Sequence, residues 1–189
     1  MGKVVVSQFV TVDGVVEDPG GSEGFDRGGW AFKFDRGPEG DKFKLDEVMA
    51  SDALLLGRVT YEGFAAAWPS RKDPVGFADK FNSMPKYVVS TTMEKADWNN
   101  STIIGSDLAK EVGELKDRHE KDVLVNGSAT LVDALAERDL VDEYRLMVFP
   151  VVLGAGKRMF SDLDSQRALR LTDSKPAGAC TILVYEPER

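Results

Sequence analysis

The feature that most restricts the fold of this chain is a regular alternation of short apolar runs with helical patterns. Such alternation is typical of a sheet covered by helices rather than of a helical bundle or a β-sandwich. The apolar runs cover residues 4–12, 53–56, 87–90, 102–104, 123–125, 143–152 and 181–185. Several are apolar without alternation, as expected for strands buried on both faces. We therefore predict a mostly parallel α/β sheet, to which the β-rich final third adds antiparallel strands.

Four segments between these runs have helical patterns: residues 41–50, 59–67, 107–119 and 129–138. In the last of them Leu131, Ala134 and Leu135 share one face, so this helix is expected to lie on the sheet. Residues 18–40 contain seven glycines and two prolines and are too long for a routine connection. This segment is either a lid or binding loop, or a plain surface insertion.

Length and composition narrow the class of protein. The 189 residues are 42% hydrophobic, enough for one sizeable core, so we predict a single domain over residues 1–189. The formal charge of -8 repels a phosphate backbone and argues against nucleic acid as a partner. No apolar stretch is long enough for a signal peptide or a membrane span, so we expect no membrane partner and a cytoplasmic location.

Cysteine and histidine offer little chemistry. The single cysteine, Cys180, allows no intramolecular disulfide or thiolate cluster and reads as a small buried hydrophobe. The single histidine, His119, stands among charges in "LKDRHEKD", where a catalytic or metal-binding role is not expected. We predict no metal site.

Three corners where a strand ends have the properties of anion sites. A strand that ends in glycine before a helix presents free backbone N–H groups and the positive end of the helix dipole. Gly57-Arg58 and Gly127-Ser128 are two such corners, and "VVSTT" places Ser90, Thr91 and Thr92 just past a third strand. Neither the P-loop nor the Rossmann fingerprint fits "VVLGAGKRM". Each corner alone can also be explained by turn glycines, helix caps and a solvated arginine.

The order and spacing of the corners carry a family resemblance over nearly the whole chain. The segments concerned are "VTVDGVVED", "DALLLGRVTYEGF", "KYVVSTT", "VLVNGSATLVDALAERDLVDEYRLMVFPVVLGAGKRMF" and "CTILVYEP". They resemble the dihydrofolate reductase superfold, most closely the branch with the C-terminal reductase domain of the bifunctional riboflavin-biosynthesis deaminase/reductase. The resemblance implies a three-layer α/β fold with a central mixed sheet of about eight strands, and an NADPH-dependent reductase.

The resemblance also assigns a cofactor site. It implies that Gly57, Arg58 and Thr60 face the cofactor phosphates and that Ser90, Thr91 and Thr92 lie near the adenosine. Gly127, Ser128, Ala129 and Thr130 would hold the pyrophosphate, with Asn126-Gly127 standing where the family has two glycines. An arginine with nearby hydroxyls suits a 2′-phosphate, which favours NADPH over NADH. A side chain at Asn126 would crowd the backbone if that position needs a positive φ.

The catalytic and substrate residues depend more heavily on the resemblance. An ungapped count back from Gly57 places Asp41 where folate reductases have their acidic residue, although an acid in a first helical turn is also favoured by the dipole. Asp13 and Gly14 match a turn beside the nicotinamide and substrate, or form only a turn. Trp30 either closes over a flat ring or anchors its loop. The resemblance also implies that one segment lines the substrate pocket opposite the nicotinamide. Its candidate substrate-binding residues are Phe149, Pro150, Val151, Leu153 and Gly154.

The sequence thus predicts an NADPH-dependent reductase of a small heterocyclic or imine/carbonyl substrate. The best named candidate is 5-amino-6-(5-phosphoribosylamino)uracil, reduced in riboflavin biosynthesis. No His-x-Glu with a downstream Pro-Cys-x-x-Cys is present, so the deaminase partner reaction is not expected. The alternatives are dihydrofolate reduction and a non-catalytic NADPH-binding module. We expect a homodimer, as members of the family commonly pair.

Overall fold

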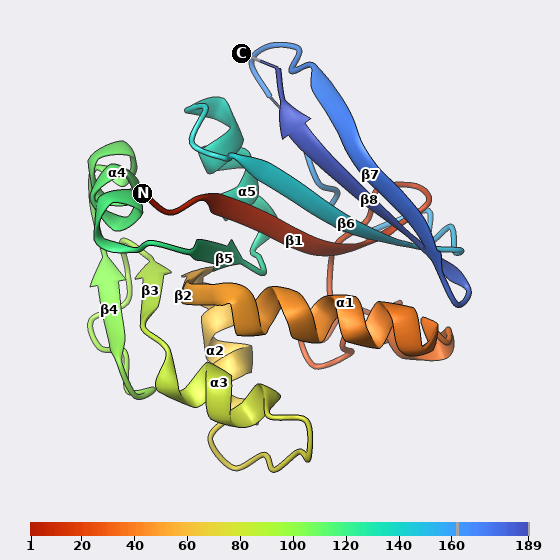
Figure 1. The fold of residues 1–189 in the computed structure, drawn as a ribbon, viewed down its shortest axis with the longest axis horizontal. Helices are drawn as coiled ribbons and strands as arrows, with labels where there is room; N and C mark the ends of the chain where they lie inside the picture. The colour runs from red at the N-terminus through yellow and green to blue at the C-terminus, as the bar shows by residue number, and fades with distance from the viewer. Residues whose placement is uncertain (162, 189) are drawn as a thin grey trace.

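One mixed sheet with helices on both faces organises the computed structural model, which describes residues 1–161 and 163–188 (Figure 1). The strands among these residues are β1 (Val4–Thr11), β2 (Ser51–Gly57), β3 (Lys86–Val89), β4 (Ser101–Ile104), β5 (Asp122–Val125), β6 (Glu143–Phe149), β7 (Leu169–Ala177) and β8 (Cys180–Pro187). The helices are α1 (Gly37–Ala50), α2 (Arg58–Ala67), α3 (Phe77–Ser83), α4 (Leu108–Arg118) and α5 (Ala129–Glu137), with a 3-10 turn, η1 (Trp30–Lys33). The three-layer α/β prediction is confirmed.

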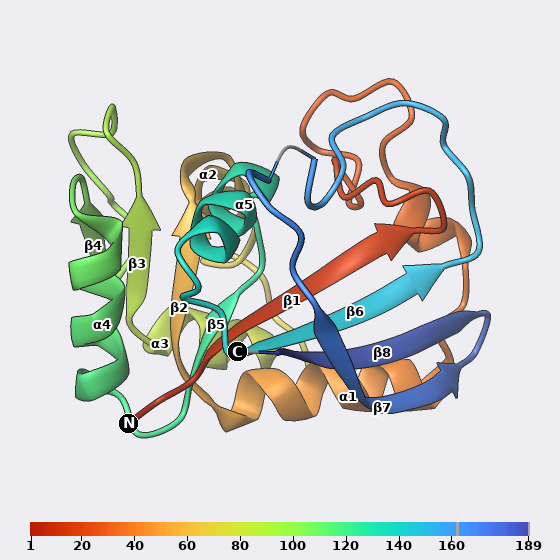
Figure 2. The same ribbon diagram turned by 90° about the horizontal axis from the view of Figure 1, so that it is seen from above.

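The strand order explains why the predicted corners meet. The described strands lie in the order β4-β3-β2-β5-β1-β6-β8-β7. All neighbours from β4 to β6 are parallel, and only β8 and β7 run antiparallel. The carboxyl ends of β3, β2, β5 and β1 therefore share one edge of the sheet (Figure 2). Ligands of open α/β sheets bind at this edge.

The continuous apolar runs follow from burial on two faces. Along β2, Ala53 and Leu55 pack toward α4 and α5, while Leu54 and Leu56 pack toward α1, α2 and α3. Figure 1 shows these two groups of helices on opposite faces of the sheet. A third cluster, around Phe149, fills the space beside β6 and β8.

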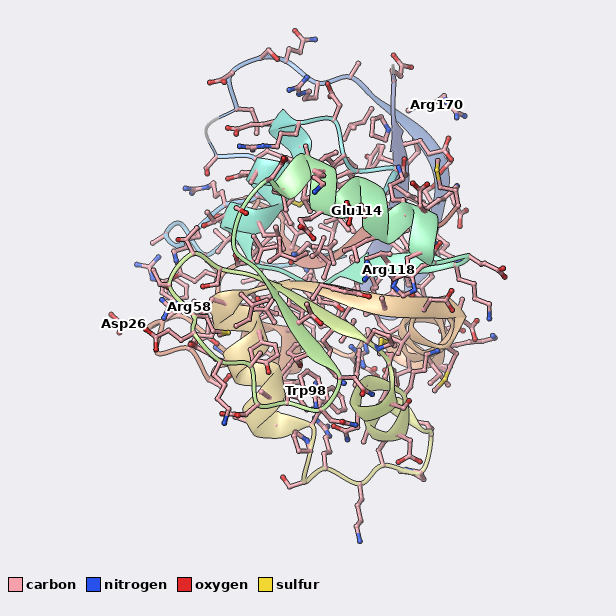
Figure 3. The ribbon with its side chains drawn as sticks, turned by 90° about the vertical axis from the view of Figure 1, so that its left-hand side faces the viewer. Asp26, Arg58, Trp98, Glu114, Arg118 and Arg170 are labelled. Carbon is pink, nitrogen blue, oxygen red and sulfur yellow. The ribbon has the colours of Figure 1, made fainter. Side chains whose placement is uncertain are left out.

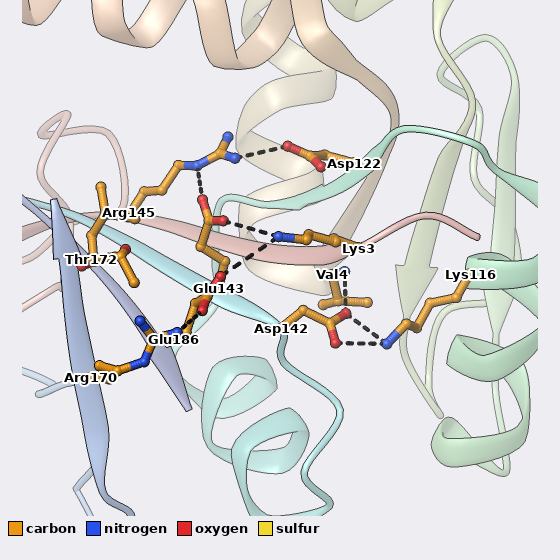
Figure 4. A network of polar contacts seen from close by, with 11 residues as sticks. Lys3, Val4, Lys116, Asp122, Asp142, Glu143, Arg145, Arg170, Thr172 and Glu186 are labelled. Carbon is orange, nitrogen blue, oxygen red and sulfur yellow. Dashed lines mark hydrogen bonds and ion pairs between the residues drawn. The ribbon is translucent and has the colours of Figure 1, made fainter. Parts of the chain in front are cut away.

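Ion pairs hold the amino end of β1 to its neighbours, away from the predicted site (Figure 4). Arg145 of β6 contacts Glu143 at 2.6 Å and Asp122 at 2.9 Å. Lys116 of α4 pairs with Asp142 at 2.6 Å, and Asp142 also accepts the backbone N–H of Val4 at 2.9 Å. Apart from the Arg145–Glu143 pair within β6, these contacts join different elements of the chain, so they stabilise the fold rather than the site.

Three elements differ from the sequence expectations. Strand β7 was not among the seven apolar runs, because it is an edge strand whose residues are nearly all exposed. Helix α3 was also missed; the Asp73 carboxylate accepts the N–H groups of Gly76, Phe77 and Ala78 at its start. Helix α1 begins at Gly37 rather than at residue 41, with Pro38 in its first turn, where proline is tolerated. In addition, β6 pairs parallel with β1, so the antiparallel part begins only at β8.

The long glycine-rich segment is folded around buried side chains. The Asp18 carboxylate, 1% exposed, accepts the N–H groups of Ser22, Glu23 and Phe25. Trp30 is fully buried, donates its indole N–H to the Glu17 carbonyl at 2.9 Å and packs edge-on against Phe149. Trp30 therefore anchors this loop and does not lie open to close over a ligand ring.

Candidate functional site

The corners at the ends of β2 and β5 touch each other. The Gly57 N–H donates to the Gly127 carbonyl at 3.0 Å. A Cβ at Gly57 would lie 2.4 Å from Ser128 Oγ, and a Cβ at Gly127 would lie 2.7 Å from Thr60 Oγ1. Close packing therefore requires glycine at both positions. The Ser128 hydroxyl lies against the backbone of Gly57, and the Thr60 hydroxyl lies against the backbone of Gly127.

Two helices begin at this junction. Arg58 is the first residue of α2; its side chain is 51% exposed and pairs with Glu62 at 3.7 Å, reaching outward in Figure 3. Ser128 caps α5, accepting the Leu131 N–H at 3.4 Å. The N-termini of α2 and α5 lie side by side, which concentrates positive dipole ends at one edge of the sheet.

The third corner lies next to the first along the sheet. Gly57 is the register partner of Val89, so Ser90 follows directly beside the start of α2. The Ser90 hydroxyl accepts the N–H groups of Thr92 at 3.2 Å and Met93 at 3.0 Å, a local turn, while Thr91 and Thr92 are exposed. The structure therefore brings all three predicted corners together.

The concern about Asn126 does not apply. The positive φ of 124° falls on Gly127, which is followed by a cis peptide to Ser128, whereas Asn126 has no positive φ. The Asn126 side chain instead points across to β1, donating to the Ser7 carbonyl at 3.4 Å. Because the glycine stands where the left-handed backbone is needed, the corner keeps its shape.

A basic cavity adjoins the start of α5 and was not predicted. It has a volume of about 450 Å³ and is lined by Ala129, Thr130, Gly156, Lys157, Arg158 and Ser161. Asp133 of α5 fixes the facing loop by accepting the Phe160 N–H and the Ser161 hydroxyl, both at 3.1 Å. The sequence signal was "GAGKRM", which we tested only against phosphate-loop fingerprints. The cavity combines a helix N-terminus with two cationic residues, of which Arg158 donates to the Asp13 carbonyl at 3.0 Å and pairs with the Asp13 carboxylate at 3.7 Å.

Asp13 ties the end of β1 to the loop after β6. Its carboxylate accepts the Thr11 hydroxyl at 2.6 Å and the N–H groups of Leu153 at 3.1 Å and Gly154 at 2.7 Å. The Thr11 hydrogen bond, more than any other contact, lowers the pKa of Asp13 to about 2. At neutral pH this group therefore holds no proton to donate. Gly14, with a φ of 82°, completes the turn.

The other nominated substrate residues divide into buried and accessible ones. Phe149 is 1% exposed and packs against Phe9 and Phe34, so its ring belongs to the core cluster. Pro150 and Gly154 are exposed, and Val151 and Leu153 are half-buried. Of the five residues nominated in this segment, these four offer surface to a ligand.

Asp41 faces solvent. Its side chain is 66% exposed and pairs with Arg36 at 2.5 Å. Farther along α1, Glu47 and Val48 are buried, and the Lys44 side chain pairs with Glu47. A catalytic role for Asp41 stays a prediction.

The single histidine and the single cysteine are packed within the fold, away from the three corners. His119 lies at the end of α4, 3.2 Å from the Tyr87 hydroxyl, and burial lowers its pKa. Cys180 is buried in the Phe149 cluster, and burial raises its pKa. Within the described part of the chain, no group of three or more His, Cys, Asp or Glu residues could hold a metal ion. Nor does any helix described here have the length and apolar character to cross a membrane.

The strand order and the paired glycine corners define a dihydrofolate-reductase-like α/β protein. Within that class the chain belongs to the RibD C-terminal domain family, whose model matches residues 2–183. A relative in Bacillus subtilis (strain 168), the uncharacterized protein YyaP, is 28% identical over 176 residues, covering 92% of this chain and 88% of YyaP.

Solved structures agree on the fold. A putative riboflavin biosynthesis protein from Shewanella sp. PV-4 superposes with a TM-score of 0.79 at 20% identity, covering 99% of both chains. Dihydrofolate reductase from Enterococcus faecalis, solved with NADP(H), gives a TM-score of 0.59 at 15% identity, covering 99% of this chain and 97% of that one. At these identities the likeness concerns the fold.

Proposed function

We propose that this protein is an NADPH-dependent reductase. The observation that supports it most is the close contact of the corners at Gly57 and Gly127, which aligns two helix N-termini beside a basic cavity. Such an edge suits the pyrophosphate of a dinucleotide, because backbone N–H groups and cations can approach it together. Family membership supports reductase chemistry. The bound cofactor would supply the hydride, and the chain would position it and the substrate.

Arg58 is the residue proposed to select NADPH. Its guanidinium is half exposed and, among the described residues, has one contact, a long ion pair to Glu62 at 3.7 Å, so it can turn toward a phosphate. The exposed hydroxyls of Thr91 and Thr92 lie after the neighbouring strand. An arginine and hydroxyls at one strand edge suit a 2′-phosphate, whereas a carboxylate would favour NADH.

The substrate is proposed to be a small heterocycle carrying an imine or carbonyl group. The best candidate is 5-amino-6-(5-phosphoribosylamino)uracil, because the chain belongs to the RibD C-terminal domain family. The exposed and half-buried residues of the segment after β6, with Asp13 shaping their loop, would face it. Dihydrofolate reduction is the second candidate, on the fold shared with dihydrofolate reductase. Homodimer formation and a cytoplasmic location remain predictions.

Arg58→Ala tests the cofactor assignment. We expect NADPH affinity to fall about tenfold or more and NADH affinity to change less than about threefold, because only NADPH carries the phosphate that Arg58 would bind. Calorimetric titration with both cofactors measures this. Arg170→Ala is the matched control, since Arg170 is an exposed arginine on the distant edge strand β7 (Figure 3). Equal losses for the two cofactors, or none, would contradict the assignment.

A further inference from the structure

The chain has one asparagine that directly precedes a glycine, and the pair stands at the corner where β5 ends. Asn126-Gly127 occupies the place where the resemblance implies two glycines. In such a pair the backbone nitrogen most readily attacks the side-chain amide, because glycine has no side chain to block the approach. The asparagines at positions 82, 99 and 100 precede serine or asparagine instead.

The two groups that would react are lightly held. The Gly127 N–H, which would attack, donates to no acceptor among the described residues. The Asn126 amide nitrogen, which would leave as ammonia, donates to the Ser7 carbonyl over a long 3.4 Å. The amide oxygen, Oδ1, has no hydrogen-bond partner in the described part of the chain. Few contacts therefore hold this side chain away from the Gly127 nitrogen.

We propose that Asn126 is a site of deamidation. The Gly127 nitrogen forms a bond to Asn126 Cγ, its proton passes to the side-chain nitrogen, and that nitrogen leaves as ammonia. A succinimide ring remains, and water opens it by adding to one of its two carbonyl carbons. The product is an aspartate or an isoaspartate, depending on which ring bond breaks. Water can reach the pair, because Asn126 and Ser128 are only half-buried.

An aspartate here places a negative charge beside the polar cluster of Lys44, Glu47 and Ser7. The Ser7 carbonyl accepts the Asn126 amide, and the Ser7 hydroxyl donates to the buried Glu47 carboxylate at 2.8 Å. Lys44 already pairs with Glu47. Two carboxylates then share one cation, and the added charge repels a phosphate at the adjoining corner.

An isoaspartate disturbs the contact between the two corners. It adds a methylene group to the backbone just before Gly127, whose carbonyl accepts the Gly57 N–H at 3.0 Å. Gly127 has no room to move toward α2, since a Cβ there would lie 2.7 Å from Thr60 Oγ1. The lengthened backbone therefore breaks the packing of the corner. The resulting loss of cofactor affinity rests on the proposed function, whereas the modification and its effect on stability do not.

Ageing of the purified protein in neutral buffer, followed by peptide mass spectrometry, tests the modification. We expect the Asn126 peptide to gain the mass of a deamidation and to become a substrate of protein isoaspartate methyltransferase. The exposed Asn100, which precedes Ser101, is the internal control and should convert more slowly. In Asn126→Gln we expect no such product, because glutamine would have to close a larger ring.

The same aged samples test the consequence. We expect the unfolding midpoint of the aged wild type to fall by about 2 °C or more and its NADPH affinity to fall about tenfold. Aged Asn126→Gln should keep its own starting values. Asn126→Asp, which makes one product directly, should weaken NADPH binding about tenfold without ageing.

The inference is overturned if Asn126 stays intact throughout or converts no faster than Asn100. It is also overturned if aged Asn126→Gln loses as much stability as the aged wild type, because the damage would then lie elsewhere. Unchanged NADPH affinity in Asn126→Asp would overturn the effect assigned to the new charge. Failure of the unaged wild type to bind NADPH would instead refute the proposed function, and the peptide and midpoint measurements would still decide this inference.

Discussion

At the scale of single residues, Asp13 shows how a predicted site residue shapes the site without reacting. Its carboxylate holds the loop after β6 through Leu153 and Gly154, and its pKa of about 2 keeps it ionised. Carboxylates stabilised in this way contribute to folding only while they are deprotonated. Asp13 therefore positions the loop that would face the substrate.

Asp13→Asn should lower the free energy of unfolding by about 1 kcal/mol at pH 7, given a pKa of 3.8 in the unfolded chain, a pKa of about 2 in the folded one and screening of this partly exposed carboxylate by solvent. Because the folded-state pKa is the lower one, this stabilisation is present above pH 3.8 and is lost as the pH falls toward 2. Urea denaturation from pH 2 to 7 measures it. Asp26→Asn, at an exposed loop position, is the control; a pH-independent difference for Asp13→Asn would contradict the assignment.

Some residues at the candidate site could be named from the sequence, and others could not. Arg58 and Ser128 were found because they follow strands and glycines within a few positions. The Lys44, Glu47 and Ser7 cluster was missed because its members come from β1 and α1, some forty residues apart. Only the packing of α1 on the sheet shows that Glu47 is buried and Asp41 is not.

At the scale of elements, the contact between the β2 to α2 corner and the β5 to α5 corner is the central feature. Neither glycine can carry a side chain without moving the other corner. The sequence could place a glycine at each strand end, but could not show that the two are in contact, since that depends on β2 and β5 being neighbours.

Gly57→Ala should destabilise the protein by about 1–3 kcal/mol and weaken NADPH binding, because the new Cβ would lie 3.0 Å from the Ser128 backbone nitrogen. Thermal unfolding and calorimetric titration of the same samples measure both effects. Gly63→Ala is the control, since a Cβ there has no neighbour within 4 Å and the helix should tolerate or prefer alanine. Unchanged stability and affinity in Gly57→Ala would show that the corner is loosely packed.

The elements themselves were predicted where burial leaves a pattern. The parallel strands are apolar because both faces are covered, so their runs were visible. Strand β7 is exposed, and α3 has only seven residues and depends on the Asp73 carboxylate for its start, so neither has a strong apolar period. Local pattern therefore predicted the described strands, including edge strand β4, but not the exposed edge strand β7.

At the scale of the whole molecule, the fold and the three strand-end corners that the structure brings together could be predicted from the sequence, and the substrate could not. The chain is acidic overall, with a net charge of -8, yet Lys157 and Arg158 gather at the start of α5. A local basic cavity in an acidic protein favours a small anionic ligand over a polyanion. A dinucleotide is a small anionic ligand of this kind. The charge distribution does not identify the substrate.

The most direct test of the account is calorimetric titration of the wild-type protein with NADPH, beside a thermal-shift measurement. We predict saturable binding of one NADPH per chain, with a Kd of about 1–100 µM, and a midpoint of unfolding that rises with cofactor concentration. NADH should bind at least about tenfold more weakly. No binding heat and no thermal shift at about 1 mM NADPH would contradict the proposal that these strand ends form a dinucleotide site.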